Sequence, residues 1–215
     1  MSEITDEFLP LELKNIFESV EYEDFGKLLI DSIEINNQDN IHFNFTVNIE
    51  GDYSEIGFNE NHSWNLLINN CREYRIEDSR DFESFIYVYS EHILLSNFKE
   101  KWKELYFNGE NKNVNQLFVE FYNLHKYTFD DFIAMDKFIC NRNLTKLLNS
   151  NNALFARGPI SILEEYFQLL KNGNKNPYYL ETANNYKNSE INKNLKIIFI
   201  GNNYFISENF EFQKR

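Results

Sequence analysis

The most constraining feature of this sequence is a strict two-residue alternation between positions 42 and 49. Its apolar members are Phe43, Phe45, Val47 and Ile49, and polar residues fill the positions between them. Because successive side chains of a β-strand point to opposite faces, the pattern predicts a strand with one buried and one solvated face. Residues 28–35 also read as a strand, and the polar turn at 36–40 predicts a hairpin between the two.

The rest of the first half favours further strands and one helix. Apolar residues at helical spacing predict a short amphipathic helix near residues 10–20. Short apolar runs predict strands at 64–68, 85–89 and 105–107. We therefore expect the first half to be chiefly an antiparallel, aromatic-rich sheet.

The second half changes to helical spacing. The residues of one predicted helical face are Val114, Leu117, Phe118, Phe121 and His125. More helix is expected at 129–139 and 144–148, and another helix should begin at Pro159 and end at Gly173.

The C-terminal part closes the predicted fold. Residues 174–194 are polar and rich in Asn, and we expect a long flexible loop there. The apolar runs 195–200 and 204–207, joined by a Gly-Asn-Asn turn, predict a final strand hairpin. A sheet followed by several helices and a closing hairpin is typical of an α+β fold. We predict one α+β domain over residues 1–215.

The negative charge is concentrated at one end of the chain. Residues 1–60 contain fifteen Asp and Glu against Lys14 and Lys27, which accounts for the whole formal net charge of −13. Such an acidic part repels nucleic acid, so direct nucleic-acid binding is not expected. It suits a basic protein partner, because complementary potentials speed encounter and reject wrong partners. The alternative is that these acids only keep an aromatic-rich protein in solution.

Targeting signals and cysteine pairs are missing from the sequence. The acidic N-terminus lacks the features of a signal peptide, and no apolar run is long enough for a membrane helix. Cys71 and Cys140 have no partner at metal-ligand or redox spacing, so we expect both to be buried structural thiols. We therefore expect a protein of the bacterial-type cytoplasm that has no membrane partner, no cofactor and no metal.

Motifs that carry known chemistry are sparse. The chain has no Gly-rich nucleotide loop and no serine-hydrolase elbow. His92 beside Glu91, and His125 near Asp130, are the only hints of a His/carboxylate site, and His125 is more simply explained as a cation at a helix C-terminus. The Arg157-Gly158-Pro159 turn could place an anion at a helix start, but a plain strand-to-helix turn explains it better.

Four segments carry a resemblance to a known bacterial family. They are Glu91-His92-Ile93-Leu94-Leu95, Tyr106-Phe107-Asn108-Gly109, Ala153 to Leu170, and Leu195 to Phe210. Their order resembles small acidic proteins with an acidic-His-x-Leu-Leu element before a strand, an Ala-Arg-Gly-Pro turn into a helix and a closing hairpin. These are similar to the immunity proteins of polymorphic toxin systems. The likeness covers about residues 61–212, and it departs at Ile93 and Ser96, where Pro and an aromatic residue are expected.

The resemblance implies a toxin inhibitor rather than an enzyme. Such a protein would neutralise a cognate toxin by occlusion and charge complementarity, with a basic toxin domain as its partner. The expected partner-binding residues come from the acidic first sixty residues, which lie outside the likeness: Glu18, Glu21, Tyr22, Glu23, Asp24, Asp52, Tyr53 and Glu55. Two alternatives stay open: an enzyme with a His/carboxylate site around His92 or His125, and a structural subunit of a larger assembly.

Overall fold

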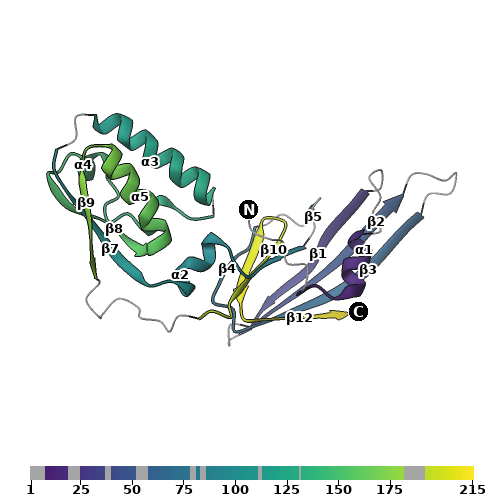
Figure 1. Ribbon diagram of the computed structural model, residues 1–215. Helices are drawn as coiled ribbons and strands as arrows, with labels where there is room; N and C mark the ends of the chain where they lie inside the picture. The colour runs from purple at the N-terminus through teal and green to yellow at the C-terminus, as the bar shows by residue number, and fades with distance from the viewer. Residues whose placement is uncertain are drawn as a thin grey trace. The chain divides into compact units, whose positions relative to one another are not determined.

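In a computed structural model, the contacts between residues divide the chain into two compact units (Figure 1). One unit comprises residues 1–92 and 194–215, and the other residues 93–193. The structure describes residues 8–18, 25–36, 40–51, 58–77, 81–82, 86–110, 113–130, 132–181 and 192–215. The sequence predicted a single domain without a boundary. That the two units unfold together as one domain stays a prediction.

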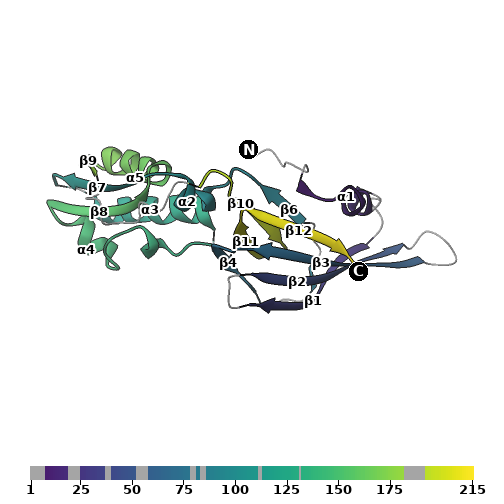
Figure 2. The same ribbon diagram turned by 90° about the horizontal axis from the view of Figure 1, so that it is seen from below.

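The first unit consists of two antiparallel sheets. The larger has the order β12-β3-β2-β1-β5. Its strands are β1 (Phe25–Ile35), β2 (Ile41–Gly51), β3 (Phe58–Asn69), β5 (Asp81–Phe82) and β12 (Asn209–Lys214). The smaller has the order β4-β11-β10-β6. Its strands are β4 (Glu73–Arg75), β6 (Ile86–Tyr89), β10 (Lys196–Ile200) and β11 (Asn203–Ser207). Figure 2 shows β1, β2 and β3 running side by side, as the predicted hairpin requires.

The alternation in β2 sorts its side chains as the sequence predicted. Phe43 and Phe45 are fully buried in the core between the sheets, where the ring of Phe43 meets Phe205 of β11 edge-on at 5.6 Å. The helix α1 (Leu11–Glu18) adds Leu13 and Ile16 to the same core. The opposite face carries a polar ladder, in which Asn44 bonds both Ser32 and Asn65.

The second unit is a three-stranded antiparallel sheet with helices. Its strands have the order β8-β7-β9. They are β7 (Trp102–Asn108), β8 (Asn152–Pro159) and β9 (Asn176–Glu181). The helical segments are η2 (Ile93–Leu95), α2 (Ser96–Lys99), α3 (Val114–Phe129), η3 (Met135–Lys137), α4 (Leu144–Leu148) and α5 (Ile160–Asn172).

Aromatic packing joins α3 and α5 to one face of this sheet. Phe121 of α3 lies 4.7 Å from Phe155 of β8, between ring centroids, and Tyr166 of α5 meets Phe155 at right angles. All three side chains are buried. The α+β fold class, the helix that ends at Gly173 and the closing hairpin β10–β11 are therefore confirmed.

Two local predictions were wrong. Residues 176–181 were expected in a flexible loop, but they form β9, because their backbone pairs with β7 from Asn108 to Lys103. Residues 182–191, in the same predicted loop, lie outside the described part of the chain. Residues 129–139 were expected to be helical, yet α3 ends at Phe129, and among residues 130 and 132–139 the structure has only the single turn η3. The chain turns back there because residues 138–140 pair with β8: the N–H of Cys140 donates to Phe155, and the N–H of Arg157 donates to Phe138.

Two features are absent from the described residues. None of the helices in these ranges is both long and apolar enough to cross a membrane. The same ranges hold no group of three or more His, Cys, Asp or Glu placed to bind a metal ion.

Candidate surface for partner binding

The predicted acidic binding residues lie almost entirely outside the described part of the chain. These are Glu21, Tyr22, Glu23, Asp24, Asp52, Tyr53 and Glu55. Glu18 alone is described: it is the last residue of α1, exposed, and 3.8 Å from the Nζ of Lys14. The acidic binding surface therefore stays a prediction.

The structure shows a different candidate, the face of the three-stranded sheet that points away from α3 and α5. Side chains alternate along β7, so Leu105 and Phe107 are buried against the helices and their neighbours point the other way. We call this surface the outer face. Its residues are Trp102, Glu104, Tyr106, Arg157, Tyr178 and Leu180. Tyr178 is 36% and Leu180 47% exposed, so part of this face is apolar and accessible.

A connected set of contacts holds the centre of the outer face in place. Arg157 Nε donates to Glu104 Oε1 at 2.6 Å, and the hydroxyl of Tyr106 donates to the other carboxylate oxygen at 2.9 Å. That hydrogen bond, with burial, raises the pKa of Tyr106. The ring of Tyr178 stacks on that of Tyr106, with centroids 5.7 Å apart. The polar groups are thus oriented by one another, and the two tyrosine rings stack nearly parallel to each other.

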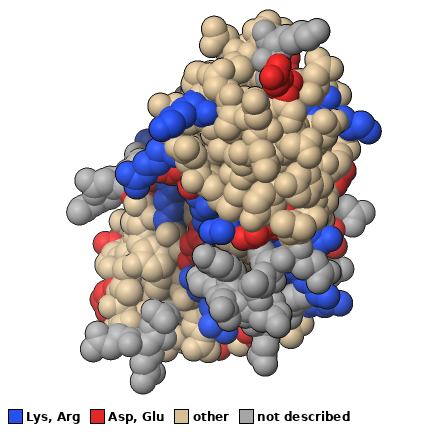
Figure 3. Space-filling model, turned by 90° about the vertical axis from the view of Figure 1, so that its left-hand side faces the viewer, with Lys and Arg blue, Asp and Glu red and all other residues tan. Residues whose placement is uncertain are grey.

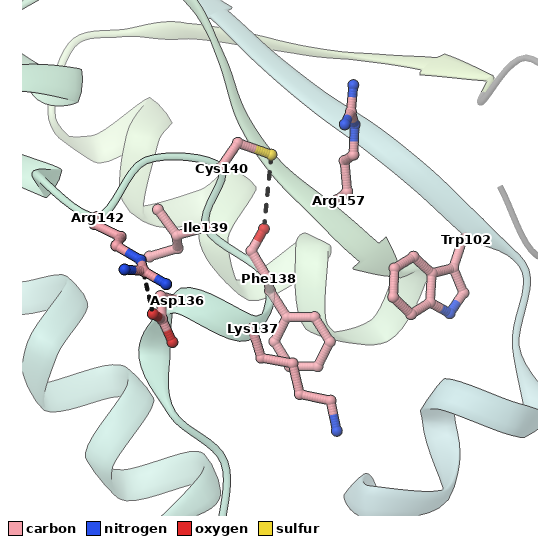
Figure 4. A pocket seen from close by; sticks show the side chains of 8 residues that line it. All are labelled: Trp102, Asp136, Lys137, Phe138, Ile139, Cys140, Arg142 and Arg157. Carbon is pink, nitrogen blue, oxygen red and sulfur yellow. Dashed lines mark hydrogen bonds and ion pairs between the residues drawn. The ribbon is translucent and has the colours of Figure 1, made fainter.

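A pocket of about 380 Å³ opens where the outer face meets residues 136–142. Trp102 and Arg157 line one side, and the turn that contains η3 lines the other (Figure 4). Cys140 also lines it, which corrects the prediction of a buried structural thiol: the residue is exposed, whereas Cys71 is buried as expected. The sulfur itself is partly buried, 3.9 Å from the carbonyl oxygen of Phe138, and this partial loss of solvent raises the pKa of the thiol.

Figure 3 shows Lys and Arg side chains at several places on one face, with a group of them along its left side beside acidic residues.

The two histidines of the predicted His/carboxylate alternative have packing roles. His125 Nε2 donates to the carbonyl oxygen of Ile133 at 2.7 Å, so Nδ1 accepts from the hydroxyl of Tyr166 at 3.1 Å. Burial lowers the pKa of His125. The neutral ring therefore connects α3 to Tyr166 and Ile133, and it is not the helix-end cation that the sequence suggested. His92 packs against the rings of Tyr89 and Phe199, and burial lowers its pKa too.

Arg157 does not face an anion at a helix start. It lies inside β8, and its guanidinium is bound by Glu104. The first turn of α5 has an acceptor from the chain itself, because the N–H of Ser161 donates to Glu100 Oε2 at 2.9 Å.

Sequence reasoning missed most of the outer face. Tyr178 and Leu180 fell in the predicted loop, Tyr106 was noticed only as a strand and family residue, and Trp102 was not singled out. The available signal was the apolar run Tyr178-Tyr179-Leu180 within a polar segment. No family model, no curated protein and no solved structure matches this chain.

Proposed function

We propose that this protein is a protein-binding inhibitor and that the outer face contacts its partner. The observation that supports the proposal is a sheet face with partly exposed Trp, Tyr and Arg side chains, among which Arg157, Tyr106 and Tyr178 are held in place through contacts with one another and with Glu104. These residue types dominate the binding energy of protein interfaces. Side chains already fixed in place lose little entropy on binding, which favours affinity.

The finer proposal is an immunity protein that neutralises a bacterial toxin. It rests on the resemblance of residues 61–212 to such proteins and on the acidic first sixty residues. In this arrangement the outer face supplies the anchor residues. The acidic residues steer a basic toxin domain towards the complex, and inhibition is steric with no turnover.

The test is co-expression with the product of the adjacent upstream gene, scored by growth rescue and by the Kd of the purified complex. Tyr178→Ala should raise Kd at least about tenfold, because it removes the exposed ring that stacks on Tyr106 of the central strand. Tyr127→Ala is the matched control: Tyr127 is almost fully exposed on α3, and its loss should change Kd less than about twofold. Equal effects of the two variants would contradict the outer face as the binding surface.

The acidic residues need a separate test. Reversing Glu21, Glu23 and Asp24 together to Lys should slow association and flatten its salt dependence, while dissociation changes less. An unchanged association rate would contradict the steering role. No complex and no growth rescue would contradict the immunity proposal itself.

A further inference from the structure

The strand β9 is an edge strand of the second unit. In the order β8-β7-β9 it pairs with β7 on one side, and Figure 2 shows it at the margin of the sheet. On its other side, no backbone hydrogen bond comes from the described residues. A row of N–H and C=O groups at the edge of a sheet is a template to which another strand can add.

The hydrogen-bond pattern shows which residues of β9 face this edge. The N–H of Gly109 donates to the carbonyl of Asn151, so the next pair of that hairpin, Asn108 and Asn152, is one without hydrogen bonds between its members. The backbone groups of Asn108 therefore turn to β9, where the paired residue is Asn176. Because the direction alternates along a strand, the backbone groups of residues 178 and 180 also point to β7, and those of residues 177, 179 and 181 point outwards.

Pro177 agrees with this assignment. Proline has no N–H, and it is accepted in an edge strand where the missing donor would face away from the sheet. The outward side of β9 therefore carries the N–H groups of Tyr179 and Glu181 and the carbonyl groups of all three outward residues.

We propose that two copies of this protein associate by antiparallel pairing of their β9 strands, about a two-fold axis at Tyr179. Tyr179 then lies opposite the same residue of the second copy, and the two exchange a pair of N–H···O=C bonds. Glu181 lies opposite Pro177 of the second copy, and its N–H donates to that carbonyl group. By symmetry the same bond forms twice, so all four outward N–H groups of the two strands have an acceptor.

The side chains are self-complementary in the same register. Tyr178 and Leu180 are exposed on the outer face. In the pair of strands, Tyr178 of one copy lies opposite Leu180 of the other, so these apolar side chains cover each other. Glu181 is the one charged residue of β9, and it lies opposite Pro177, so like charges do not meet. The edge thus suits a second copy, and the two outer faces join on one six-stranded sheet.

Sedimentation equilibrium of the full chain tests the association. The average mass should rise towards twice the monomer mass as the concentration increases, with a Kd on the order of 100 μM, because a contact between two short strands is small. Glu181→Pro should weaken the dimer at least about tenfold, since it removes two of the four bonds between the copies. The lost N–H does not face β7, so the urea midpoint of the monomer should stay unchanged.

A second pair of variants tests the side chains. Leu180→Ser should weaken the dimer about threefold or more, because Leu180 loses its contact with Tyr178 of the second copy. Val119→Ser is the matched control: Val119 is 52% exposed on α3, in the same unit as Leu180, and its replacement should leave the dimer unchanged.

Disulfide capture tests the register. Tyr178→Cys and Leu180→Cys are made as two proteins, each with Cys140→Ser to remove the exposed native thiol. Residues opposite each other in a non-hydrogen-bonded pair have Cα atoms about 4.5 Å apart, which a disulfide can bridge. A mixture of the two proteins should therefore form a linked dimer that neither forms alone.

Three outcomes would overturn the proposal. They are a chain that stays monomeric up to about 500 μM, a Glu181→Pro variant that dimerises as well as the unaltered protein, and a single cysteine variant that links as well as the mixture. Because no toxin partner is present in these experiments, their failure leaves the proposed function untouched.

Discussion

The guanidinium of Arg157 and the carboxylate of Glu104 lie directly opposite each other in the register of β7 and β8, with Nε and Oε1 2.6 Å apart. The Glu104 side chain is only 12% exposed, so it depends on this partner and on Tyr106. The pair links the outer face to the pocket, since Arg157 belongs to both.

Removal of Arg157 alone should destabilise the second unit. Arg157→Gln leaves the Glu104 carboxylate largely buried with Tyr106 as its remaining partner, at a cost of about 1–3 kcal/mol in the free energy of unfolding. The double variant with Glu104→Gln should recover part of that loss, because no unpaired charge remains. Urea unfolding of the four proteins of this double-mutant cycle measures the coupling. Additive effects would show that the pair contributes nothing beyond its separate residues.

Lys175 should be important for the stability of the second unit, because its side chain joins the segments that contain Gly109 and Ser150. The residue is 2% exposed, and its Nζ donates to the carbonyl oxygens of Gly109 and Ser150 and lies 4.7 Å from the centroid of the Phe107 ring. Lys175→Met keeps the stem but leaves both carbonyls without their donor, so we expect a loss of about 2–4 kcal/mol in unfolding free energy. Lys171→Met, at an exposed position of α5, should change it by less than about 0.5 kcal/mol. Similar values for the two variants in urea unfolding would refute this.

Stability should fall as the pH drops below about 6.5, the usual pKa of histidine. Burial lowers the pKa of His125 and of His92 in the folded protein. Between that lowered value and 6.5 the unfolded chain takes up a proton that the folded chain does not, so stability present above pH 6.5 is lost on acidification. Each group contributes a slope of at most about 1.4 kcal/mol per pH unit.

The measurement is urea unfolding at pH 7.5, 6.5 and 5.5. His125→Gln retains a donor for Ile133 and cannot titrate, so its stability should depend less on pH than that of the unaltered protein. His42→Gln is the control, because His42 is only partly buried and alternates with the buried Ile41 and Phe43, so it lies on the wet side of the larger sheet. Identical pH profiles for all three proteins would rule out His125 as a source of the dependence.

Gly158 should tolerate no side chain. A Cβ at this position would lie 2.9 Å from Phe138 Cδ1, and the Phe138 ring is itself held by Trp102 and Phe129. Gly158→Ala should therefore cost about 1–3 kcal/mol through overpacking. Phe138→Leu in the same chain removes the clash, so the double variant should lose less than the sum of the two single variants. The same urea assay measures it, and strictly additive losses would contradict the clash.

Several elements could be predicted from local sequence because their cause is local. Alternation over positions 42–49 places Phe43 and Phe45 in the core for any strand that has one dry face. Helical spacing and the stop at Gly173 likewise define α5, and the apolar runs around Gly201 define the closing hairpin. The acidic partner residues were also chosen from local composition, and apart from Glu18 they lie outside the described part of the chain.

The outer face could not be predicted in this way. Tyr178 and Leu180 form a surface only because β9 pairs with β7, some seventy residues earlier. The apolar run Tyr178-Tyr179-Leu180 can indicate a strand, but it does not say which strand is its partner. The neutral state of His125 depends on Tyr166 and Ile133, which come from separate segments.

The sequence by itself determined the α+β class, the solvated and buried sides of β2, and the ends of the best-marked helix, because periodicity and turn residues act over a few positions. Only the tertiary structure decided that Glu104 and Arg157 meet, that Cys140 is exposed, and that three distant strands share one aromatic face. Those features arise from backbone hydrogen bonds between segments far apart in the chain, and such pairings leave no local pattern.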